Sequence, residues 1–504
     1  MAMNDVVVVG GRRRWAALGV LVGSVLLLAI DGTVLYLAVP SLSRDLAPTA
    51  TEVLWIGDVY SLALAGLLVT TGTLADRVGR KRVLLVGTAA FGAASLLAAF
   101  STSSEMLIGA RLLLGVAGAT IMPSTLSIIR NLFPDARERT RAIAIWSAGS
   151  GGGLALGPLI GGALLERFWW GSVFLVNVPV VVVFLVAGGL LLPESRNPDP
   201  GRFDLVSAGL SFAAITPLVY AVKHAVGSGP DGWTVGSALV GLVAAVLFVR
   251  RQRRTDPPLI DVGLFRNAAF TGAVLANVIA IFALTGLLFF FSQYLQFVRG
   301  FSPLVAGLAE MPTMVASVVV IGVVGVVAAR WGTGRAVAAG LATAAVGLLL
   351  VAVAEGAESY LWLGLALLPV GLGVGLAMTL TVDAVVSAVP PHRAGAASAI
   401  SETAYELGVV LGIAVLGSVV TLAYRANLDV PGAARPAVED SVGSALAALD
   451  PASPLVAPVK EAFTIAMQTT STIAAVITAV AALVAWRTIP SGRNTGTRSA
   501  SEGA

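Results

Sequence analysis

The sequence contains no cysteine and only two histidines among its 504 residues. The missing cysteines exclude disulfides, thiolate metal sites and cysteine catalysis. Without a cluster of histidines and carboxylates we expect no metal site. Charged residues are also scarce, at 12% of the chain, whereas soluble proteins carry about 25%. Hydrophobic residues make up 57%, more than a soluble core can hide. These proportions predict a protein embedded in a membrane.

Long apolar runs divide the chain into segments that can cross a membrane. A helix needs about 20 apolar residues to span the hydrocarbon layer, and helices are expected because lipid offers the backbone no hydrogen-bonding partner. The sequence therefore predicts an all-α membrane protein. Its fourteen expected spans are 15–39, 52–75, 83–101, 105–129, 141–165, 172–192, 204–224, 234–250, 269–297, 304–329, 336–354, 361–388, 395–423 and 461–487.

The basic residues predict the orientation of these spans. Most of the 32 lysines and arginines lie in alternate connecting segments, and such segments face the cytoplasm. Both termini then lie inside a multi-pass protein of the cytoplasmic (inner) cell membrane. In this assignment Lys223 belongs to an outer segment, and Arg111 is the one basic residue within a span. Because the basic residues sit in the turns, we expect no nucleic-acid partner; we expect a monomer in contact with membrane lipid.

Two stretches of sequence recur along the chain. The polar turn Gly72–Arg82 shares a glycine, an alanine, an arginine and a second glycine, in the same register, with Gly325–Arg335. The stretch Ala110–Met122 corresponds in the same way to Ala366–Met378. A repeat of this length indicates a duplicated bundle.

The repeats predict two six-helix halves with two helices inserted between them. The segment between the last two spans is rich in alanine, proline and aspartate, and the sequence leaves open whether it forms a small hairpin. The expected parts are a cytoplasmic N-terminus at 1–14, a first half at 15–192, inserted helices with cytoplasmic linkers at 193–268, a second half at 269–487 with an extracellular segment at 425–460, and a cytoplasmic tail at 488–504.

Acidic residues inside apolar spans are candidates for function, because burying an unpaired carboxylate is costly. Asp31 lies near the middle of the first span, and Asp58 lies in the outer part of the second. Glu402 and Glu406 lie one turn apart on one face of the thirteenth span, where neighbouring carboxylates raise each other's affinity for protons. These acids bind protons or a cationic substrate, or else they are paired or hydrated structural groups.

Three further charged residues lie within spans. Arg111 is either a structural partner for one of the acids or an element of a proton relay. Glu310 and Asp383 are secondary candidates in the tenth and twelfth spans, and Glu310 is close enough to the outer boundary that simple hydration is an alternative.

Aromatic and thioether side chains near the acids suit a delocalised cation. Trp55, Tyr60 and Tyr405 each lie within a turn of an acid, and an aromatic face attracts a cation by roughly 0.5–2 kcal/mol. Met122 offers an adaptable apolar surface. The alternative for each side chain is packing or contact with lipid. The expected substrate-binding set is Asp31, Trp55, Asp58, Tyr60, Met122, Tyr405 and Glu406.

Small residues and a charged turn are candidate moving parts. Gly153, Gly157 and Gly161 clear one face of the fifth span for close approach of another helix, and Pro158 permits a kink. Asp76 ends a helix, where the dipole is unfavourable for a carboxylate, and so requires a partner. The basic residues of this turn either enforce topology or form a charge latch. The expected gate consists of Gly72, Asp76, Arg77, Gly79, Arg80, Gly153, Gly157, Pro158 and Gly161.

These motifs resemble the signature motifs of the major facilitator superfamily. Gly72–Arg82 and Arg111 followed by Gly115 carry the resemblance, and Gly153–Gly162 resembles the antiporter motif of its drug exporters. Fourteen spans, together with Leu54–Leu62 and Met122–Ser127, are similar to the 14-helix drug:proton antiporters that export quaternary ammonium compounds.

The resemblance implies proton-driven export of lipophilic cations, such as ethidium, by alternating access and without a cofactor. It assigns proton coupling to Asp31, Asp58, Glu402, Glu406 and Arg111. Two positions that are acidic in similar exporters are Ser317 and Ser401 in this sequence, a departure that bears on the recognition of divalent cations.

Two alternative functions share this fold: export of an endogenous antibiotic or metabolite, and lipid translocation. A membrane-embedded enzyme is disfavoured, because the sequence shows no set of nucleophile, base and orienting group and no cofactor-binding loop.

Overall fold

The computed structural model describes residues 11–196, 204–255, 258–389, 394–432 and 434–491. The first ten residues and the tail beyond residue 491 lie outside this range. Four of the arginines that predict the orientation also lie outside it, namely Arg202, Arg393, Arg493 and Arg498.

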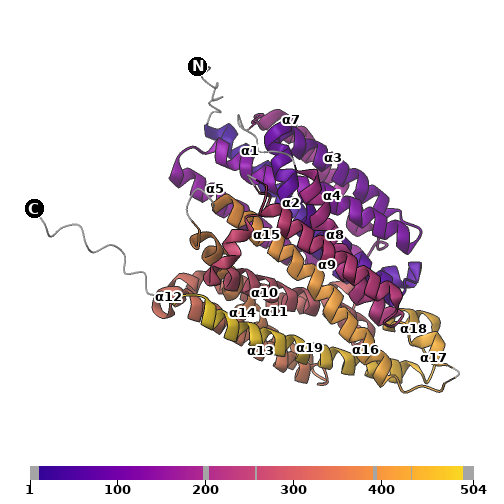
Figure 1. Ribbon diagram of the computed structural model, residues 1–504. Coiled ribbons are helices and arrows are strands. Elements are labelled where there is room, and N and C mark those ends of the chain that lie inside the picture. Colours follow the sequence, from indigo (N-terminus) through magenta and orange to yellow (C-terminus); the bar gives the residue numbers. More distant parts are fainter. Residues whose placement is uncertain (1–10, 197–203, 256–257, 390–393, 433, 492–504) are drawn as a thin grey trace, which may run out of the picture. The chain divides into compact units, whose positions relative to one another are not determined.

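The described part of the chain is helical and contains no strand (Figure 1). The elements are α1 (Gly11–Leu46), α2 (Ala50–Val78), α3 (Arg80–Ala99), α4 (Ser104–Leu132), α5 (Ala136–Leu165), α6 (Ser172–Leu175), α7 (Asn177–Leu191), α8 (Leu205–Gly227), α9 (Gly232–Gln252), η1 (Val262–Arg266), α10 (Ala268–Gln293), η2 (Tyr294–Val298), α11 (Pro303–Val319), α12 (Ile321–Trp331), α13 (Thr333–Ala354), α14 (Tyr360–Ser387), α15 (Ala394–Leu411), η4 (Gly412–Leu416), α16 (Gly417–Asn427), α17 (Arg435–Val438), α18 (Val442–Ala448) and α19 (Val456–Thr488).

The helices match the predicted spans in number and position. Within the described residues, 13 helices are long and apolar enough to cross a membrane, and the pair α11 and α12 supplies a fourteenth span that bends by 48°. The prediction of an all-α membrane protein is therefore confirmed. The structure adds the break in the tenth span, which the sequence does not signal with a proline at that point.

Contacts between helices group the chain into two units. The first comprises residues 1–259, 288–311 and 413–467, and the second comprises the rest. Within the first unit α1 packs against α5, α2 packs against α4 and α8, and α8 packs against α9. Within the second unit α14 packs against both α13 and α15. The predicted halves at 15–192 and 269–487 follow chain order and stay a prediction.

The two repeated turns have a glycine in the left-handed region at the same position. Gly79 has φ +127° between α2 and α3, and Gly332 has φ +78° between α12 and α13. Side chains are strained in this region, whereas glycine is not. The second glycine of the repeated motif is thus explained by the backbone reversal. The position of Asp76 in the first turn is occupied by Ala329 in the second, so the repeat copies the bend and not its charge pair.

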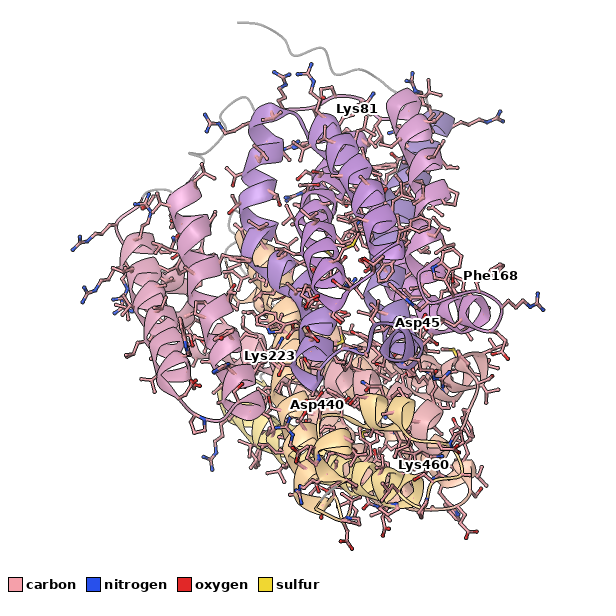
Figure 2. The ribbon with its side chains drawn as sticks, turned by 90° about the vertical axis from the view of Figure 1, so that its right-hand side faces the viewer. Asp45, Lys81, Phe168, Lys223, Asp440 and Lys460 are labelled. Carbon is pink, nitrogen blue, oxygen red and sulfur yellow. The ribbon has the colours of Figure 1, made fainter. Side chains whose placement is uncertain are left out.

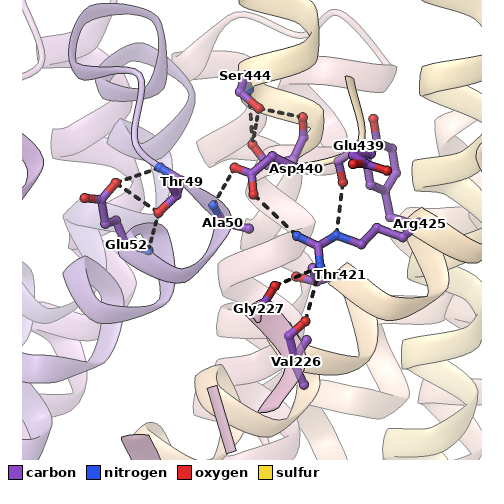
Figure 3. A network of polar contacts seen from close by, with 12 residues as sticks. Thr49, Ala50, Glu52, Val226, Gly227, Thr421, Arg425, Glu439, Asp440 and Ser444 are labelled. Carbon is purple, nitrogen blue, oxygen red and sulfur yellow. Dashed lines mark hydrogen bonds and ion pairs between the residues drawn. The ribbon is translucent and has the colours of Figure 1, made fainter. Parts of the chain in front are cut away.

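The segment after α16 forms two short helices, α17 and α18, and no strand hairpin. Figure 3 shows how it is attached within the first unit. Arg425 donates to the carbonyls of Glu439 and Val226, at 3.1 and 3.2 Å, and forms an ion pair with Asp440 at 3.4 Å. The Asp440 carboxylate also accepts from the backbone amide of Ala50 at 2.9 Å. The segment therefore ties the C-terminal end of α8 to the N-terminal end of α2.

Candidate functional site

Asp31 is fully buried in α1 and has hydrogen-bonding partners on two other helices. Its Oδ2 accepts from Nη1 of Arg111 on α4 at 3.1 Å, and its Oδ1 accepts from Nδ2 of Asn177 on α7 at 2.7 Å. The exposed fractions of the Arg111 and Asp31 side chains are 1% and 0%. A buried carboxylate is tolerated only when it is paired and hydrogen-bonded, and here both carboxylate oxygens are satisfied where α1, α4 and α7 meet.

Arg111 links this carboxylate to α2. Its Nε donates to the carbonyl oxygen of Ile56 at 3.3 Å, and its guanidinium lies over the ring of Tyr60, 4.6 Å from the centroid. Arg111 is thus the partner of a membrane acid, which is the structural role that the sequence offered for it. A role in a proton relay remains a prediction. Asn177 was not among the predicted site residues. The sequence signal that could have identified it is a single amide side chain within an apolar run.

Asp58 is also fully buried, and its partner is a residue that the sequence assigned to an outer segment. Lys223, inside α8, donates from Nζ to Oδ1 of Asp58 at 2.7 Å, and both side chains are 0% exposed. The same ammonium lies 3.8 Å from the ring centroid of Trp55. Placing Lys223 in a wet segment was therefore wrong, because α8 continues to Gly227 and the lysine charge is neutralised within the bundle.

A polar cavity of about 300 Å³ adjoins this ion pair. Figure 2 labels two of its residues, Lys223 and Asp440, on the same side of the first unit and far from Lys81 in the turn between α2 and α3. Tyr220 and His224 stack against each other at 5.3 Å, and His224 contacts Asp231 at 3.0 Å. The cavity is lined by Thr49, Thr51, Trp55, Tyr220, Lys223, His224, Gly227, Ser228, Arg425 and Asp440.

The glycine face of α5 packs against α1, as its spacing predicts. A Cβ at Gly153 would lie 2.6 Å from the Cβ of Ala29, and a Cβ at Gly157 would overlap the hydroxyl of Thr33. Real side chains do not approach this closely, so glycine is required for the observed separation. The neighbouring Gly162 faces the start of α11, where its Cβ would lie 2.8 Å from the Cα of Leu304.

A second helix contact involves Pro158 of α5, which faces Gly307 of α11 through its backbone carbonyl. The segment of α5 that carries the glycines is therefore packed on one side against α1 and on another against α11, all within the first unit.

The turn between α2 and α3 holds the charge pair that Asp76 requires. Nη2 of Arg80 lies 2.7 Å from Oδ1 of Asp76, across Gly79. Glu194, which follows α7, accepts from the backbone amide of Lys81 at 3.2 Å. A Cβ added at Gly72 would lie 3.4 Å from the Cβ of Pro123, so Gly72 packs against α4. Arg77 is exposed. Glu194 is the member of this network that the sequence analysis missed.

The acids predicted in the thirteenth span belong to the second unit. Glu402 is half-buried on α15, and Glu406, one turn later, is 7% exposed. Tyr405 between them is half-buried. Ser401 stands at a position that is acidic in similar exporters. Its carbonyl oxygen accepts a hydrogen bond from Nδ2 of Asn277 at 3.2 Å. The assignment of proton coupling to these glutamates stays a prediction.

The secondary candidates differ from expectation. Glu310 is 0% exposed, and neither of its carboxylate oxygens has a hydrogen bond within the described residues, which contradicts simple hydration. The reason is that α11 packs into the first unit one turn earlier, at Gly307. Asp383, in contrast, is exposed near the end of α14, so it is not a buried acid. Met122 is half-buried on α4.

Glu355, directly after α13, is a buried acid that the sequence analysis did not select. It is 1% exposed, and its Oε1 accepts from the hydroxyl of Ser471 on α19 at 3.1 Å. Burial raises the pKa of Glu355 to about 8, and the hydrogen bond from Ser471 opposes this shift.

Comparison with known proteins decides the family. A family model described as Major Facilitator Superfamily matches residues 21–413, which is more than half of the chain. The chain belongs to the major facilitator superfamily. It is 47% identical over 481 residues to the multidrug efflux pump LfrA of Mycolicibacterium smegmatis, and the match covers 94% of this chain and 95% of the relative. It is 37% identical over 420 residues to the methyl viologen resistance protein SmvA of Salmonella typhimurium, covering 83% and 85%.

Solved structures agree on the fold of this major facilitator. A bacterial homologue of the human lysosomal transporter Spinster, in an inward-facing and unoccupied conformation, matches with a TM-score of 0.68 and covers 95% of this chain and 98% of that one. At 17% identity this likeness shows the fold alone.

The family and the relatives show that this major facilitator is a multi-pass membrane transporter and not an enzyme. The predicted resemblance to the drug-exporting members of the superfamily is confirmed, since the relatives are named as an efflux pump and a resistance protein.

Proposed function

We propose that this transporter is a proton-coupled antiporter that exports lipophilic cations by alternating access, with both termini and the Arg80 turn in the cytoplasm. The names of its relatives support drug export: one is a multidrug efflux pump, and another is a methyl viologen resistance protein. The distribution of basic residues supports the orientation. No cofactor is required, because the proton gradient supplies the driving force.

The observation that carries the proposal is the environment of Asp58. Its carboxylate and the face of Trp55 together hold an organic ammonium, that of Lys223, at 2.7 Å from Oδ1 and 3.8 Å from the ring centroid. A carboxylate paired with an aromatic face is the combination that recognises a lipophilic cation. The site therefore already contains the chemistry that a quaternary ammonium compound or a cationic dye would use.

Asp31 is the candidate proton site. Its carboxylate is buried among three helices and is paired with Arg111. Protonation of Asp31 would break this ion pair and release Arg111, which also holds the backbone of α2 at Ile56. Protonation of Asp31 would thereby change a contact of α2, the helix that carries Asp58. Glu402 and Glu406 in the second unit are further candidates for proton binding.

The close contacts of α5 are candidates for the surfaces that rearrange between states. Helix α1, which carries Asp31, packs directly on the glycine face of α5. The ion pair between Asp76 and Arg80 lies in the turn between α2 and α3, which faces the cytoplasm in the proposed orientation. We propose that both contacts change as the transporter alternates.

Proton flux in proteoliposomes tests the proposal. A pH gradient is imposed across membranes that contain the purified protein, and ethidium or tetraphenylphosphonium is added while a pH-sensitive dye is followed. Substrate-triggered proton movement that is lost in an Asp31→Asn variant is expected. Methyl viologen in a parallel experiment tests divalent cations, for which Ser317 and Ser401 provide no charge.

Absence of proton movement with every cation, from protein that is inserted and folded, would overturn the proposal. Screens of neutral and anionic metabolites, and translocation of labelled lipids, would then test the two alternative functions.

A further inference from the structure

Lys223 is the one feature of the Asp58 site that cation recognition does not need. It comes from α8, one of the two helices that are additional to the predicted six-helix halves. Its ammonium lies against both groups that suit a cationic substrate, the carboxylate of Asp58 and the indole of Trp55. A lysine in this position fills the cation site with a charge that belongs to the protein.

The surroundings of Lys223 give its ammonium a second place to lie. The cavity of about 300 Å³ beside it is lined in part by polar groups, among them Asp440 on the segment that follows α16, which is paired there with Arg425. A lysine ammonium is a compact charge on a flexible stem with three rotatable donors. Movement of the ammonium from Asp58 into the cavity would use this flexible stem. Oδ2 of Asp58 has no hydrogen bond within the described residues, so the carboxylate retains an oxygen for another partner.

We propose that Lys223 is a tethered competitor for the cation site. A lipophilic cation displaces the ammonium of Lys223 from Asp58 and Trp55 into the adjoining cavity, and return of the ammonium expels the cation. This inference rests on the proposed function, and it assigns a role to the inserted helix α8: the intramolecular cation limits affinity and promotes release.

The competing explanation is a purely structural ion pair that joins α8 to α2. The two explanations differ in what removal of the lysine charge does to substrate binding. Competition predicts tighter binding, because the substrate no longer has to displace a charge from Asp58. A structural pair predicts unchanged or weaker binding, because its loss only disturbs the packing of α8.

The experiment measures the dissociation constant of tetraphenylphosphonium for the purified protein in detergent, in the wild type and in Lys223→Met. Methionine keeps the length of the side chain and removes the charge. Lys460→Met is the matched control, since Lys460 is a half-buried lysine of the same unit that does not line the cavity. We expect Kd to fall at least tenfold in Lys223→Met and to stay within twofold of the wild type in Lys460→Met.

Transport kinetics provide a second readout. Because tighter binding slows release, Lys223→Met should lower KM and kcat together in proteoliposomes. The gain in affinity should disappear in the double variant Asp58→Asn/Lys223→Met, in which the carboxylate is also absent. An unchanged or higher Kd in inserted Lys223→Met protein would overturn the inference. An equal gain in Lys460→Met would also overturn it, since the effect would then be a general one of net charge.

Lys223→Gln decides the matter if Lys223→Met fails to insert. Glutamine removes the charge and can still donate a hydrogen bond to Asp58. A lower Kd than that of the wild type is expected, and an unchanged or higher Kd would overturn the inference. The proposed function fails separately, and visibly, if the wild type and Lys460→Met bind no cation at all.

Discussion

Arg111 and Asp31 form an ion pair at 3.1 Å whose side chains are at most 1% exposed, although 80 positions separate them in the chain. The pair joins α4 to α1, and Asn177 completes it from α7. One buried carboxylate of α1 therefore makes polar contacts with both α4 and α7.

Replacing Asp31 by Asn should abolish proton-coupled export of ethidium and leave the protein in the membrane. Asparagine preserves the shape of the side chain but cannot bind and release a proton. The measurement is dye efflux from energised cells, with protein abundance determined in the same membranes. Asp45→Asn is the control, because Asp45 is an exposed acid of the same helix, and it should export normally. Full export by Asp31→Asn would remove this residue from the coupling mechanism.

Replacing Arg111 by Met should destabilise the protein by about 3–5 kcal/mol, because it leaves a buried carboxylate without its ion-pair partner. Adding Asp31→Asn to this variant should restore most of the loss, since the uncompensated charge is then absent. The free energy of unfolding in mixed micelles, measured for the two single variants and the double variant, checks this coupling. Strictly additive losses would show that the two side chains do not act as a pair.

Replacing Gly157 by Ala should impair the packing of α5 on α1, because the new Cβ would overlap the hydroxyl of Thr33. Overpacking of this kind costs about 1–3 kcal/mol. Gly152→Ala, in the same helix, meets nothing within 4 Å and should be neutral or slightly stabilising. Thermal stability and drug export are compared for the two variants. Equal behaviour would contradict a specific contact at Gly157.

Glu355 predicts a dependence of stability on pH. Its pKa is raised from 4.5 to about 8 by burial, so the folded state holds a proton that the unfolded state has released between these values. The associated stability is present below about pH 4.5 and is lost as the pH rises through 8. The variant Glu355→Gln removes this titration.

Melting temperatures across this pH range check the prediction. Wild-type Tm should fall, relative to that of Glu355→Gln, as the pH rises from 5 to 9. Glu358→Gln, which changes an exposed carboxyl of the same connecting segment, should follow the wild type. Parallel pH profiles for the wild type and Glu355→Gln would contradict a proton held at this position.

The helices and their order could be predicted because the signal is local. The apolar length that crosses a lipid bilayer is a property of each segment, and lipid leaves the backbone no other regular form. The glycine spacing of α5 is local in the same sense, since residues four apart share a helix face, and the structure places Gly153 and Gly157 against α1.

The candidate site could be predicted in part. Asp31, Asp58 and Arg111 stood out because each is a charge within an apolar run. Lys223 was misplaced because it lies close to the end of its run, where a lysine ordinarily reaches water. Asp383 and Glu310 were both secondary candidates, and hydration was the alternative for Glu310, yet Asp383 is the exposed one and Glu310 is buried. The difference depends on how each helix is rotated toward its neighbours, and hydrophobic length does not report rotation.

The sequence by itself determined that this chain is a membrane protein built of helices, in which order its spans follow one another, and which acids lie within them. Each of these properties is set by solvation of one segment at a time. Only the tertiary structure decided that Arg111 pairs with Asp31 and Lys223 with Asp58. Either basic residue could neutralise either acid in principle, and the choice is made by the packing of α4 on α1 and of α8 on α2, which brings one charge of each sign within hydrogen-bonding distance.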